Sequence, residues 1–297
     1  MNPVTPPPSS RPKLPRISIV MPFRDPGASY LDRALASLQW QTDDDWELIA
    51  IDDGSRDAAS ELPRLQTDPR IRLIRHERSA GLAARLNEGV SLARGRYIAR
   101  MDADDIAFPH RLQVQADYLD AHPDVDLLAA SVLMIDDAGA AIGVATSPTD
   151  HDSLVRRAAL HFPMPHPTWM GRTEWFRKHP YDERAIKAQD QHLLYRTFRS
   201  SRFAAIGQPL LAYRYAQLSV RKTLLGRYHF LRAVWANGSP ADACLSTLLH
   251  AAAAVRDLLA MALRRDRDVI RRRVGTIPDT LLDEWTRLSA QLRAARN

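Results

Sequence analysis

The chain has 297 residues, of which 45% are hydrophobic and 26% are charged, and its formal net charge is +6. This composition is ordinary for a folded globular protein and excludes collagen-like, low-complexity and disulfide-rich chains. The single Cys244 cannot form an internal disulfide or a cysteine-based metal site, which fits a reducing compartment such as the cytoplasm. The excess of Lys and Arg permits contact with nucleic acid, anionic lipid or phosphorylated ligands without choosing among them.

The first part of the chain predicts a tail followed by alternating strands and helices. Residues 1–15 contain six prolines and no apolar segment, which is unlike a signal peptide and predicts a disordered or polyproline-like tail. Buried strands are then predicted at 17–21, 46–51, 71–75 and 97–101, with helices near 31–38, 57–66 and 80–94 between them. Such alternation indicates βαβ units and a mostly parallel sheet.

Beyond residue 125 the pattern is less regular. Strands are predicted at 127–135 and 141–144 around a turn, and residues 151–216 mix short helices and strands. From Val220 to the end the chain is predicted to be almost entirely helical, with interruptions near 237–240 and 275–278. We therefore expect a tail at 1–15, an α/β domain at 16–218 and a helical C-terminal extension at 219–297.

Polar residues gather where the predicted parallel strands end. Pro22–Asp25 follow the first strand, Asp52 and Asp53 end the second, and Asp102–Asp105 follow the fourth. Ligands of open α/β sheets bind beyond these strand ends, so three clusters are expected on one rim. Carboxylates one residue apart can bind a hard divalent cation that stabilises a leaving diphosphate. The alternative is a turn with capping aspartates.

The blocks 17–25, 37–42, 46–55, 80–89 and 93–105, taken in order, resemble the family 2 glycosyltransferases. The resemblance covers roughly residues 16–216 and implies the GT-A fold, a single nucleotide-sugar-binding α/β domain. It also implies an inverting, metal-dependent transfer from a nucleoside diphosphate sugar to a glycan or lipid-linked acceptor, in cell-surface polysaccharide synthesis. The Gln-x-x-Arg-Trp signature of processive synthases is missing, so we expect one sugar per encounter.

The same resemblance implies roles for individual residues on the donor side. Arg85 would approach the base or diphosphate, or would be a plain surface residue of its helix. Asp25 stands where the family often has Asn. The implied donor residues are Pro22, Phe23 and Asp25 flanking the nucleotide, Asp53 on the base, Asp102 by the ribose and diphosphate, and Asp104, with Asp102, as ligands of Mn²⁺ or Mg²⁺.

On the acceptor side, Asp190 falls on the catalytic base of the family, which takes the proton of the incoming hydroxyl. Gln189 replaces the usual Glu before it, and the alternative is that Asp190 caps the following helix. His166 matches a family feature at the start of the acceptor region, or is structural. The family often has a histidine metal ligand after its closing Tyr-Arg segment, and residues 215–219 contain none.

The C-terminal extension leaves two interpretations open. Residues 244–263 are rich in Ala and Leu, but their charges argue against a membrane-spanning helix. An apolar stripe from Leu245 to Leu263 is interrupted by Arg256, and six arginines with two aspartates follow at 264–273. These helices would lie on an anionic membrane surface, at the inner face of the cytoplasmic membrane, or would pack with a solvated basic face.

Other classes of protein fit less well. The chain has neither G-x-G-x-x-G after a strand nor a P-loop, so dehydrogenases and P-loop enzymes are not expected. No aromatic residues interleave with the basic segment, so nucleic acid is not an expected partner. A catalytically silent GT-A relative that binds a membrane or a partner is the remaining alternative. Retention of Asp53, Asp102, Asp104 and Asp190 together argues against it.

Overall fold

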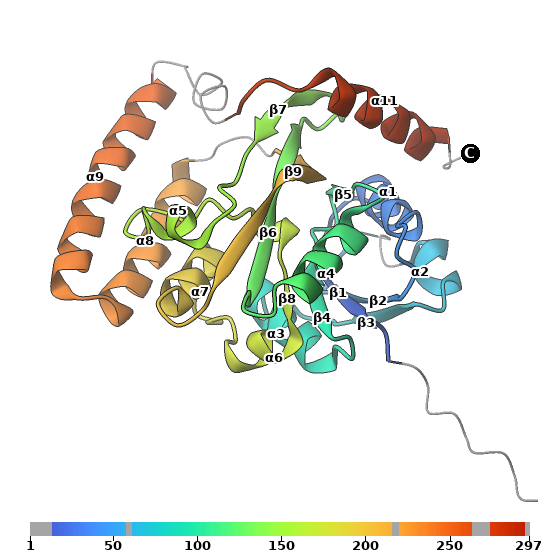
Figure 1. Cartoon of the computed structure of the whole chain (residues 1–297), viewed down its shortest axis with the longest axis horizontal. Coiled ribbons are helices and arrows are strands. Elements are labelled where there is room, and N and C mark those ends of the chain that lie inside the picture. The colour runs from blue at the N-terminus through green and yellow to red at the C-terminus, as the bar shows by residue number, and fades with distance from the viewer. Residues whose placement is uncertain (1–13, 58–60, 216–219, 263–273, 295–297) are drawn as a thin grey trace, which may run out of the picture.

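The computed structural model describes residues 14–57, 61–215, 220–262 and 274–294. At its centre is a nine-stranded sheet with strand order β3-β2-β1-β4-β8-β6-β9-β5, in which β7 pairs with β6 (Figure 1). The strands are β1 Ile17–Phe23, β2 Trp46–Asp52, β3 Ile71–Arg75, β4 Tyr97–Arg100, β5 Ile106–Ala107, β6 Leu127–Ile135, β7 Ala141–Ala145, β8 Met170–Arg172 and β9 Phe203–Arg214.

The N-terminal half of the sheet is parallel, as the sequence predicts. Strand β1 pairs in parallel with β2 and β4, and β2 pairs in parallel with β3. All residues of β1 are buried, because helices cover both faces of the sheet. The second half is mixed: β8 runs antiparallel to both β4 and β6, whereas β9 is parallel to β6. The GT-A expectation of a largely parallel α/β sheet is confirmed.

Helices on the two faces of the sheet form separate hydrophobic layers. Helices α1, α2 and α4 pack on one face with Ile19 and Leu48, and helices α3, α6 and α7 pack on the other with Val20 and Ile49. Strand residues alternate between these layers, as the period of two requires. The helices are α1 Ala28–Gln39, α2 Pro63–Thr67, α3 Leu82–Leu92, α4 Arg111–Ala121, α5 His151–Val155, α6 Thr173–Lys178 and α7 Gln189–Thr197, with a 3₁₀ turn, η2, at His166–Thr168.

Close packing of α3 on β1 depends on Gly89. A Cβ atom at this position would lie 2.3 Å from Cγ1 of Val20. Only glycine therefore lets the helix approach the strand this closely. Helix α3 begins at Leu82, directly after residues 79–81, which face the end of β2. The close packing of the helix therefore positions these residues relative to the sheet.

Three described helices follow the sheet: α8 Val220–Asn237, α9 Pro240–Ala262 and α11 Asp279–Ala294. The α8–α9 hairpin lies beside α7, where the rings of Tyr195 and Phe230 are 5.9 Å apart (Figure 1). Helix α11 returns to the sheet, and its Trp285 meets Phe108 edge to face at 6.3 Å. Among the described residues, no helix combines the length and the hydropathy needed to cross a membrane. The arginine-rich run at 264–273 and most of the tail at 1–15 lie outside the described residues.

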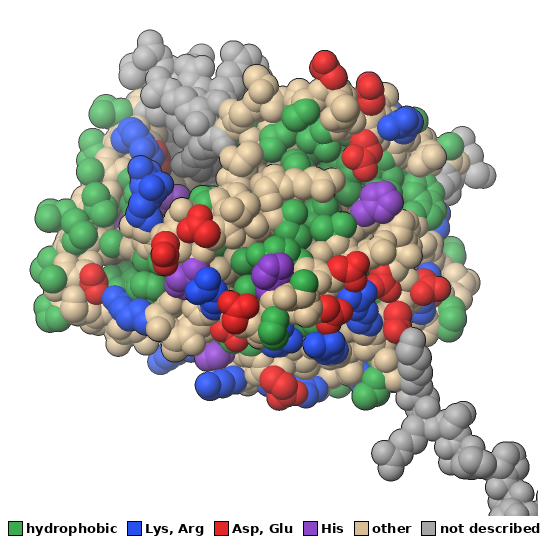
Figure 2. Space-filling model, in the orientation of Figure 1, with side chains coloured by type: hydrophobic (Ala, Val, Ile, Leu, Met, Phe, Trp, Pro, Cys, Tyr) green, Lys and Arg blue, Asp and Glu red, His purple; other side chains and the backbone are tan. Residues whose placement is uncertain are grey.

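Helix α9 has its polar side inward and its apolar side outward. Ser246, His250 and Asp257 are buried, whereas Leu248 is 70% exposed and Val255 is 58% exposed. Figure 2 shows hydrophobic side chains gathered along the edge of the molecule that α9 forms. The exposed side chains of this outer face are Leu245, Leu248, Leu249, Val255, Leu258 and Leu259. A group of exposed apolar side chains of this kind is typical of a surface that binds a protein or a membrane.

Candidate active site

An acidic cluster follows β4 in the loop that leads to β5. Carboxylate oxygens of Asp102, Asp104 and Asp105 all lie within 4.8 Å of one another. Asp105 is almost fully buried, and the other two are half-buried. Burial and the neighbouring carboxylates raise the pKa of Asp104, and they raise that of Asp105 well above its usual range. The ionised carboxylates therefore repel one another, and a bound cation would relieve this repulsion.

The residues of this cluster fit a hard divalent cation. The backbone N–H of Arg214 donates to Oδ1 of Asp105 at 2.8 Å, and Nε of Arg214 donates to the backbone oxygen of Asp104 at 3.0 Å. Strand β9 thus fixes the loop, while Oδ2 of Asp105 is buried without a partner among the described residues. Carboxylate oxygens are the ligands that Mg²⁺ and Mn²⁺ prefer. Asp105 adds a third carboxylate to the Asp102 and Asp104 pair expected from sequence.

A buried arginine stands beside the cluster. Nη2 of Arg100, at the end of β4, donates to Oδ1 of Asp102. The Arg100 side chain is 4% exposed, and its Nε and Nη1 have no partner among the described residues. Sequence reasoning missed this residue, although a charged residue inside an apolar strand run is a signal of function.

A cavity of about 1240 Å³ joins the acidic cluster to the second half of the chain. Asp102 and Arg100 line it from the end of β4, and Asp190 lines it from α7. These residues are far apart in the sequence, and the mixed half of the sheet brings them together. The structure therefore places the expected base and one of the expected metal ligands around one space.

Asp190 lies in the first turn of α7 and does not cap it. The cap position is Ala188, with φ at 53° and no side-chain hydrogen bond. Nε2 of Gln191 lies 3.4 Å from Oδ2 of Asp190, and burial raises the pKa of this carboxyl group while the charge of Arg100 opposes the rise. A carboxylate with a raised pKa is a better proton acceptor than an ordinary one.

His166 also lines this cavity, but its side chain interacts with other residues of the protein. Its Nε2 is 2.9 Å from the hydroxyl of Tyr181, and the ring meets Trp169 edge to face. Burial and the charge of Arg100 lower the pKa of His166 well below its usual range. His166 is thus neutral at pH 7 and supports the wall of the cavity.

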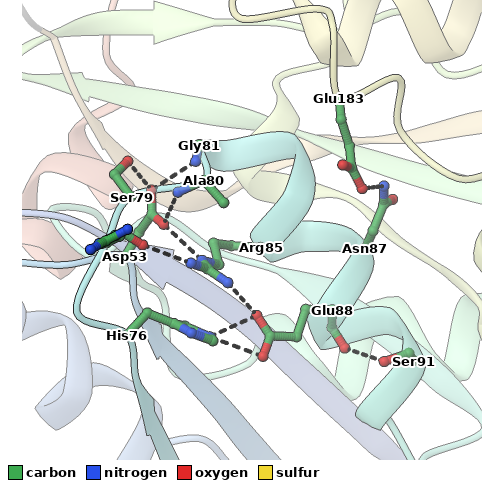
Figure 3. Close-up of polar contacts among 11 residues, drawn as sticks. Asp53, His76, Ser79, Ala80, Gly81, Arg85, Asn87, Glu88, Ser91 and Glu183 are labelled. Carbon is green, nitrogen blue, oxygen red and sulfur yellow. Dashed lines mark hydrogen bonds and ion pairs between the residues drawn. The ribbon is translucent and has the colours of Figure 1, made fainter.

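Asp53 organises the start of α3 (Figure 3). Its Oδ2 accepts from the hydroxyl of Ser79 at 2.6 Å and from the N–H of Gly81 at 3.0 Å. Its Oδ1 accepts from the N–H of Ala80 at 2.8 Å and from Nε of Arg85 at 2.7 Å. These donors lower the pKa of Asp53 against the effect of burial, so it stays ionised. Both carboxylate oxygens are engaged within the protein.

Arg85 continues this network away from Asp53. Its Nη1 donates to Glu88 at 3.0 Å, and Glu88 is 3.0 Å from Nε2 of His76 (Figure 3). The Arg85 side chain is only 11% exposed. Arg85 is therefore not a plain surface residue of its helix, since it ties α3 to the end of β2.

The remaining donor-side residues lie at the end of β1. Pro22 and Phe23 are buried, and the oxygen of Phe23 accepts from the N–H of Asp53 at 2.8 Å. Asp25 has a positive φ of 47°, and its Oδ1 accepts from the N–H of Arg56 at 2.6 Å. The C-terminal ends of β1 and β2 thus lie side by side, as expected for neighbouring parallel strands. None of the described residues 22–25, Asp53 or Arg85 lines the cavity that holds Asp190.

The fold, together with the family match that follows, defines the protein class: a glycosyltransferase of the GT-A type. Residues 18–179 match the sequence profile described as Glycosyl transferase family 2. An uncharacterised glycosyltransferase of Methanocaldococcus jannaschii is 32% identical over 234 residues, which are 75% of this chain and 80% of that protein. The chain belongs to glycosyl transferase family 2, and it is a glycosyltransferase.

Two other relatives share shorter regions or only the fold. Bifunctional glycosyltransferase pgtA of Dictyostelium discoideum is 36% identical over 136 residues, covering 40% of this chain and 18% of that protein. The crystal structure of S. aureus TarS 1-349 in complex with UDP superposes with a TM-score of 0.58 at 17% identity. That match covers 74% of this chain and 65% of the TarS chain, and it shows the GT-A fold. This chain spans less than two thirds of these two proteins.

Proposed function

We propose that this chain is a metal-dependent, inverting glycosyltransferase that moves one sugar from a nucleoside diphosphate sugar to an acceptor hydroxyl. The observation that carries the proposal is that Asp102 and Asp190 line one cavity. In an inverting transfer, the leaving diphosphate and the attacking hydroxyl lie on opposite faces of the anomeric carbon. Such a reaction needs positive charge on one side and a base on the other.

On the donor side, the acidic cluster of Asp102, Asp104 and Asp105 would hold Mn²⁺ or Mg²⁺. The bound cation would stabilise the negative charge of the leaving diphosphate. Nε and Nη1 of Arg100, which have no partner among the described residues, would donate to oxygens of the diphosphate or the sugar. We assign Pro22, Phe23, Asp25, Asp53 and Arg85 to the nucleoside side, where β1 and β2 end.

On the acceptor side, Asp190 acts as the base. It takes the hydroxyl proton while the hydroxyl oxygen bonds to the anomeric carbon and the bond from that carbon to the diphosphate oxygen breaks. The configuration of the sugar inverts because attack and departure occur on opposite faces. Burial raises the pKa of Asp190, while the hydrogen bonds of Gln191 and the charge of Arg100 oppose the rise. A carboxylate with a raised pKa accepts the hydroxyl proton better than an exposed one does.

The acceptor in this proposal is a glycan or a lipid-linked molecule used in cell-surface polysaccharide synthesis. The enzyme would act at the inner face of the cytoplasmic membrane, held there by the outer face of α9. Exposed Leu248 and Val255 support this placement, as do the arginines that the sequence carries at 264–273. An apolar helix face next to basic residues is typical of proteins that bind anionic membranes.

Thermal unfolding with a panel of nucleoside diphosphates tests the donor half of the proposal. At least one nucleoside diphosphate should raise the Tm when Mn²⁺ or Mg²⁺ is present and leave it unchanged in EDTA. Release of that nucleoside diphosphate from its sugar conjugate should then depend on Asp190. Stabilisation without any turnover of a nucleotide sugar, whatever acceptor extract is supplied, would favour the catalytically silent alternative.

A further inference from the structure

Three arginines from the second half of the chain line the cavity that holds Asp190. They are Arg157, in the segment after α5, Arg227 on α8 and Arg256 on α9, and we call them the arginine subsite. Arg157 is exposed, and its side chain makes no hydrogen bond or ion pair within the described part of the chain. The Arg227 side chain is 15% exposed, and its Nε is buried without a described partner. Both guanidinium groups therefore keep donors that no described residue uses.

One carboxylate serves two of these arginines. Asp257 pairs with Nη2 of Arg227 and, at 2.9 Å, with Nη2 of Arg256. His250 Nδ1 is 3.2 Å from Nη1 of Arg227, and burial next to this arginine lowers the pKa of His250 to about 4. The imidazole is therefore neutral at pH 7 and accepts from the arginine. Among the described residues, Asp257 is the carboxylate that pairs with these arginines, so two positive charges of the subsite have no described ion-pair partner.

A continuous wall leads from Asp190 to the arginine subsite. Gln191, next to Asp190, exchanges two hydrogen bonds with the backbone of Phe162, at 2.8 and 3.2 Å. Phe162 and its neighbour His161 line the same cavity as Arg227 and Arg256. An acceptor whose hydroxyl reaches Asp190 would therefore place its neighbouring groups along this wall.

We infer that the arginine subsite binds a phosphate group carried by the acceptor. A phosphate monoester carries about 1.5 to 2 negative charges at neutral pH, and the diphosphate that joins a sugar to a lipid carries about as many, which match the two positive charges without a described partner better than a single carboxylate does. Guanidinium groups also bind phosphate oxygens with paired hydrogen bonds. The inference rests on the proposed function, because it takes Asp190 as the place of the acceptor hydroxyl. The phosphate would belong to a lipid carrier or to a water-soluble sugar phosphate.

Titration calorimetry of the full-length protein in EDTA tests the subsite with octyl phosphate as the probe. EDTA keeps metal out of the acidic cluster, so that cluster repels the probe. Arg157→Gln should weaken binding about tenfold or more, since a hydrogen bond to a charged group contributes about 1.5–3 kcal/mol. The matched control is Arg221→Gln, an exposed arginine on α8 that does not line the cavity and should leave binding unchanged.

Two results would overturn the inference: equal affinity of Arg157→Gln and the unmutated protein, or equal weakening by Arg221→Gln. Binding of octyl glucoside as tightly as octyl phosphate would also overturn it, because the phosphate would then contribute nothing. A second variant, Arg227→Lys, keeps the charge facing Asp257 but loses the paired donors and the contact with His250. It should weaken binding at 25 °C while its far-UV circular dichroism stays that of the unmutated protein, which shows that the fold is kept.

The same proteins separate this inference from the donor proposal. A much higher affinity for octyl phosphate than for inorganic phosphate supports a lipid-carried phosphate. Equal affinities for the two probes support a soluble sugar phosphate. Arg157→Gln should keep the Mn²⁺-dependent binding of nucleoside diphosphate. If the unmutated protein binds octyl phosphate in EDTA but no nucleoside diphosphate with Mn²⁺, the donor proposal fails while the phosphate subsite stands.

Discussion

The guanidinium of Arg100 donates from Nη2 to the carboxylate of Asp102, while its Nε and Nη1 have no partner among the described residues. A buried guanidinium group thus lies beside a carboxylate cluster and keeps two N–H groups that no described residue binds. Burial lowers the pKa of Arg100, but the charge and hydrogen bond of Asp102 together with other neighbouring groups leave it above its usual value, so the guanidinium stays charged. Arg100 links the donor side of the cavity to Asp190, whose pKa its charge lowers.

Replacing Arg100 tests this link. Arg100→Met should destabilise the metal-free protein by about 2–3 kcal/mol, because Asp102 loses a charged hydrogen bond in a mostly buried site. Mn²⁺ should restore part of this loss, since a bound cation compensates the same carboxylates. Urea unfolding in EDTA and in Mn²⁺ measures both values. An equal loss in the two conditions would show that Arg100 does not share the carboxylates with a cation.

Asp104 should be required for metal-dependent donor binding. Asp104→Asn removes one charge from the acidic cluster and keeps the shape of the side chain. We expect the Mn²⁺-dependent gain in nucleoside diphosphate affinity to vanish, while the Tm in EDTA stays the same or rises because repulsion is relieved. Calorimetry with and without Mn²⁺ measures the gain. Asp124→Asn, in an exposed ion pair with Arg202, is the matched control and should behave as the unmutated protein does.

Asp190→Asn should separate catalysis from binding. The amide keeps the shape of the side chain but cannot take the hydroxyl proton, and general-base catalysis typically contributes about 10²–10⁴-fold in rate. Turnover should fall by about this factor, with metal and nucleotide binding unchanged. Glu183→Gln is the control, because Glu183 binds Asn87 and does not line the cavity. A near-normal rate in Asp190→Asn would place the base elsewhere.

His192 should make the protein less stable in mild acid. Burial lowers the pKa of His192 to about 4, below the value of about 6.5 in an unfolded chain. Between these values the unfolded chain binds a proton that the folded chain does not, so this stabilisation is complete above pH 6.5 and is lost as pH falls toward 4.

Replacing His192 removes this proton uptake. In urea unfolding from pH 7 to pH 4.5, the difference between the unmutated protein and His192→Asn should shrink as the pH falls. The slope of this difference should correspond to at most about one proton. His110→Asn, at an exposed position, should leave the pH dependence as it is. A constant difference across this range would mean that His192 is not held neutral.

The outer face of α9 should bind anionic membranes. Leu248→Glu combined with Val255→Glu places two carboxylates on this face, which should reduce co-sedimentation with vesicles that contain anionic lipid. High salt should also reduce it, because exposed charges are screened. Leu282→Glu, an exposed leucine of α11, is the matched control. Binding that ignores lipid charge, salt and these substitutions would leave the face without a membrane role.

The sequence predicts the parallel half of the sheet and the acidic loop well, because both depend on neighbouring residues. The apolar runs of β1 and β2 are buried on both faces, so they appear in the sequence as unbroken hydrophobic segments. Strand β5 is missed because two residues carry no periodic pattern. Its pairing with β9 nevertheless holds the loop with Asp102 and Asp104 in place.

The sequence by itself determined the family and the order of the strands and helices in the first half, and it predicted site roles for Asp102, Asp104 and Asp190. Only the tertiary structure decided that Asp105 joins the cluster, that Arg100 is buried with unused donors, and that Arg227 reaches the cavity from α8. The reason is physical: a motif is written in adjacent residues, whereas burial and charge compensation depend on segments that pack together from distant parts of the chain.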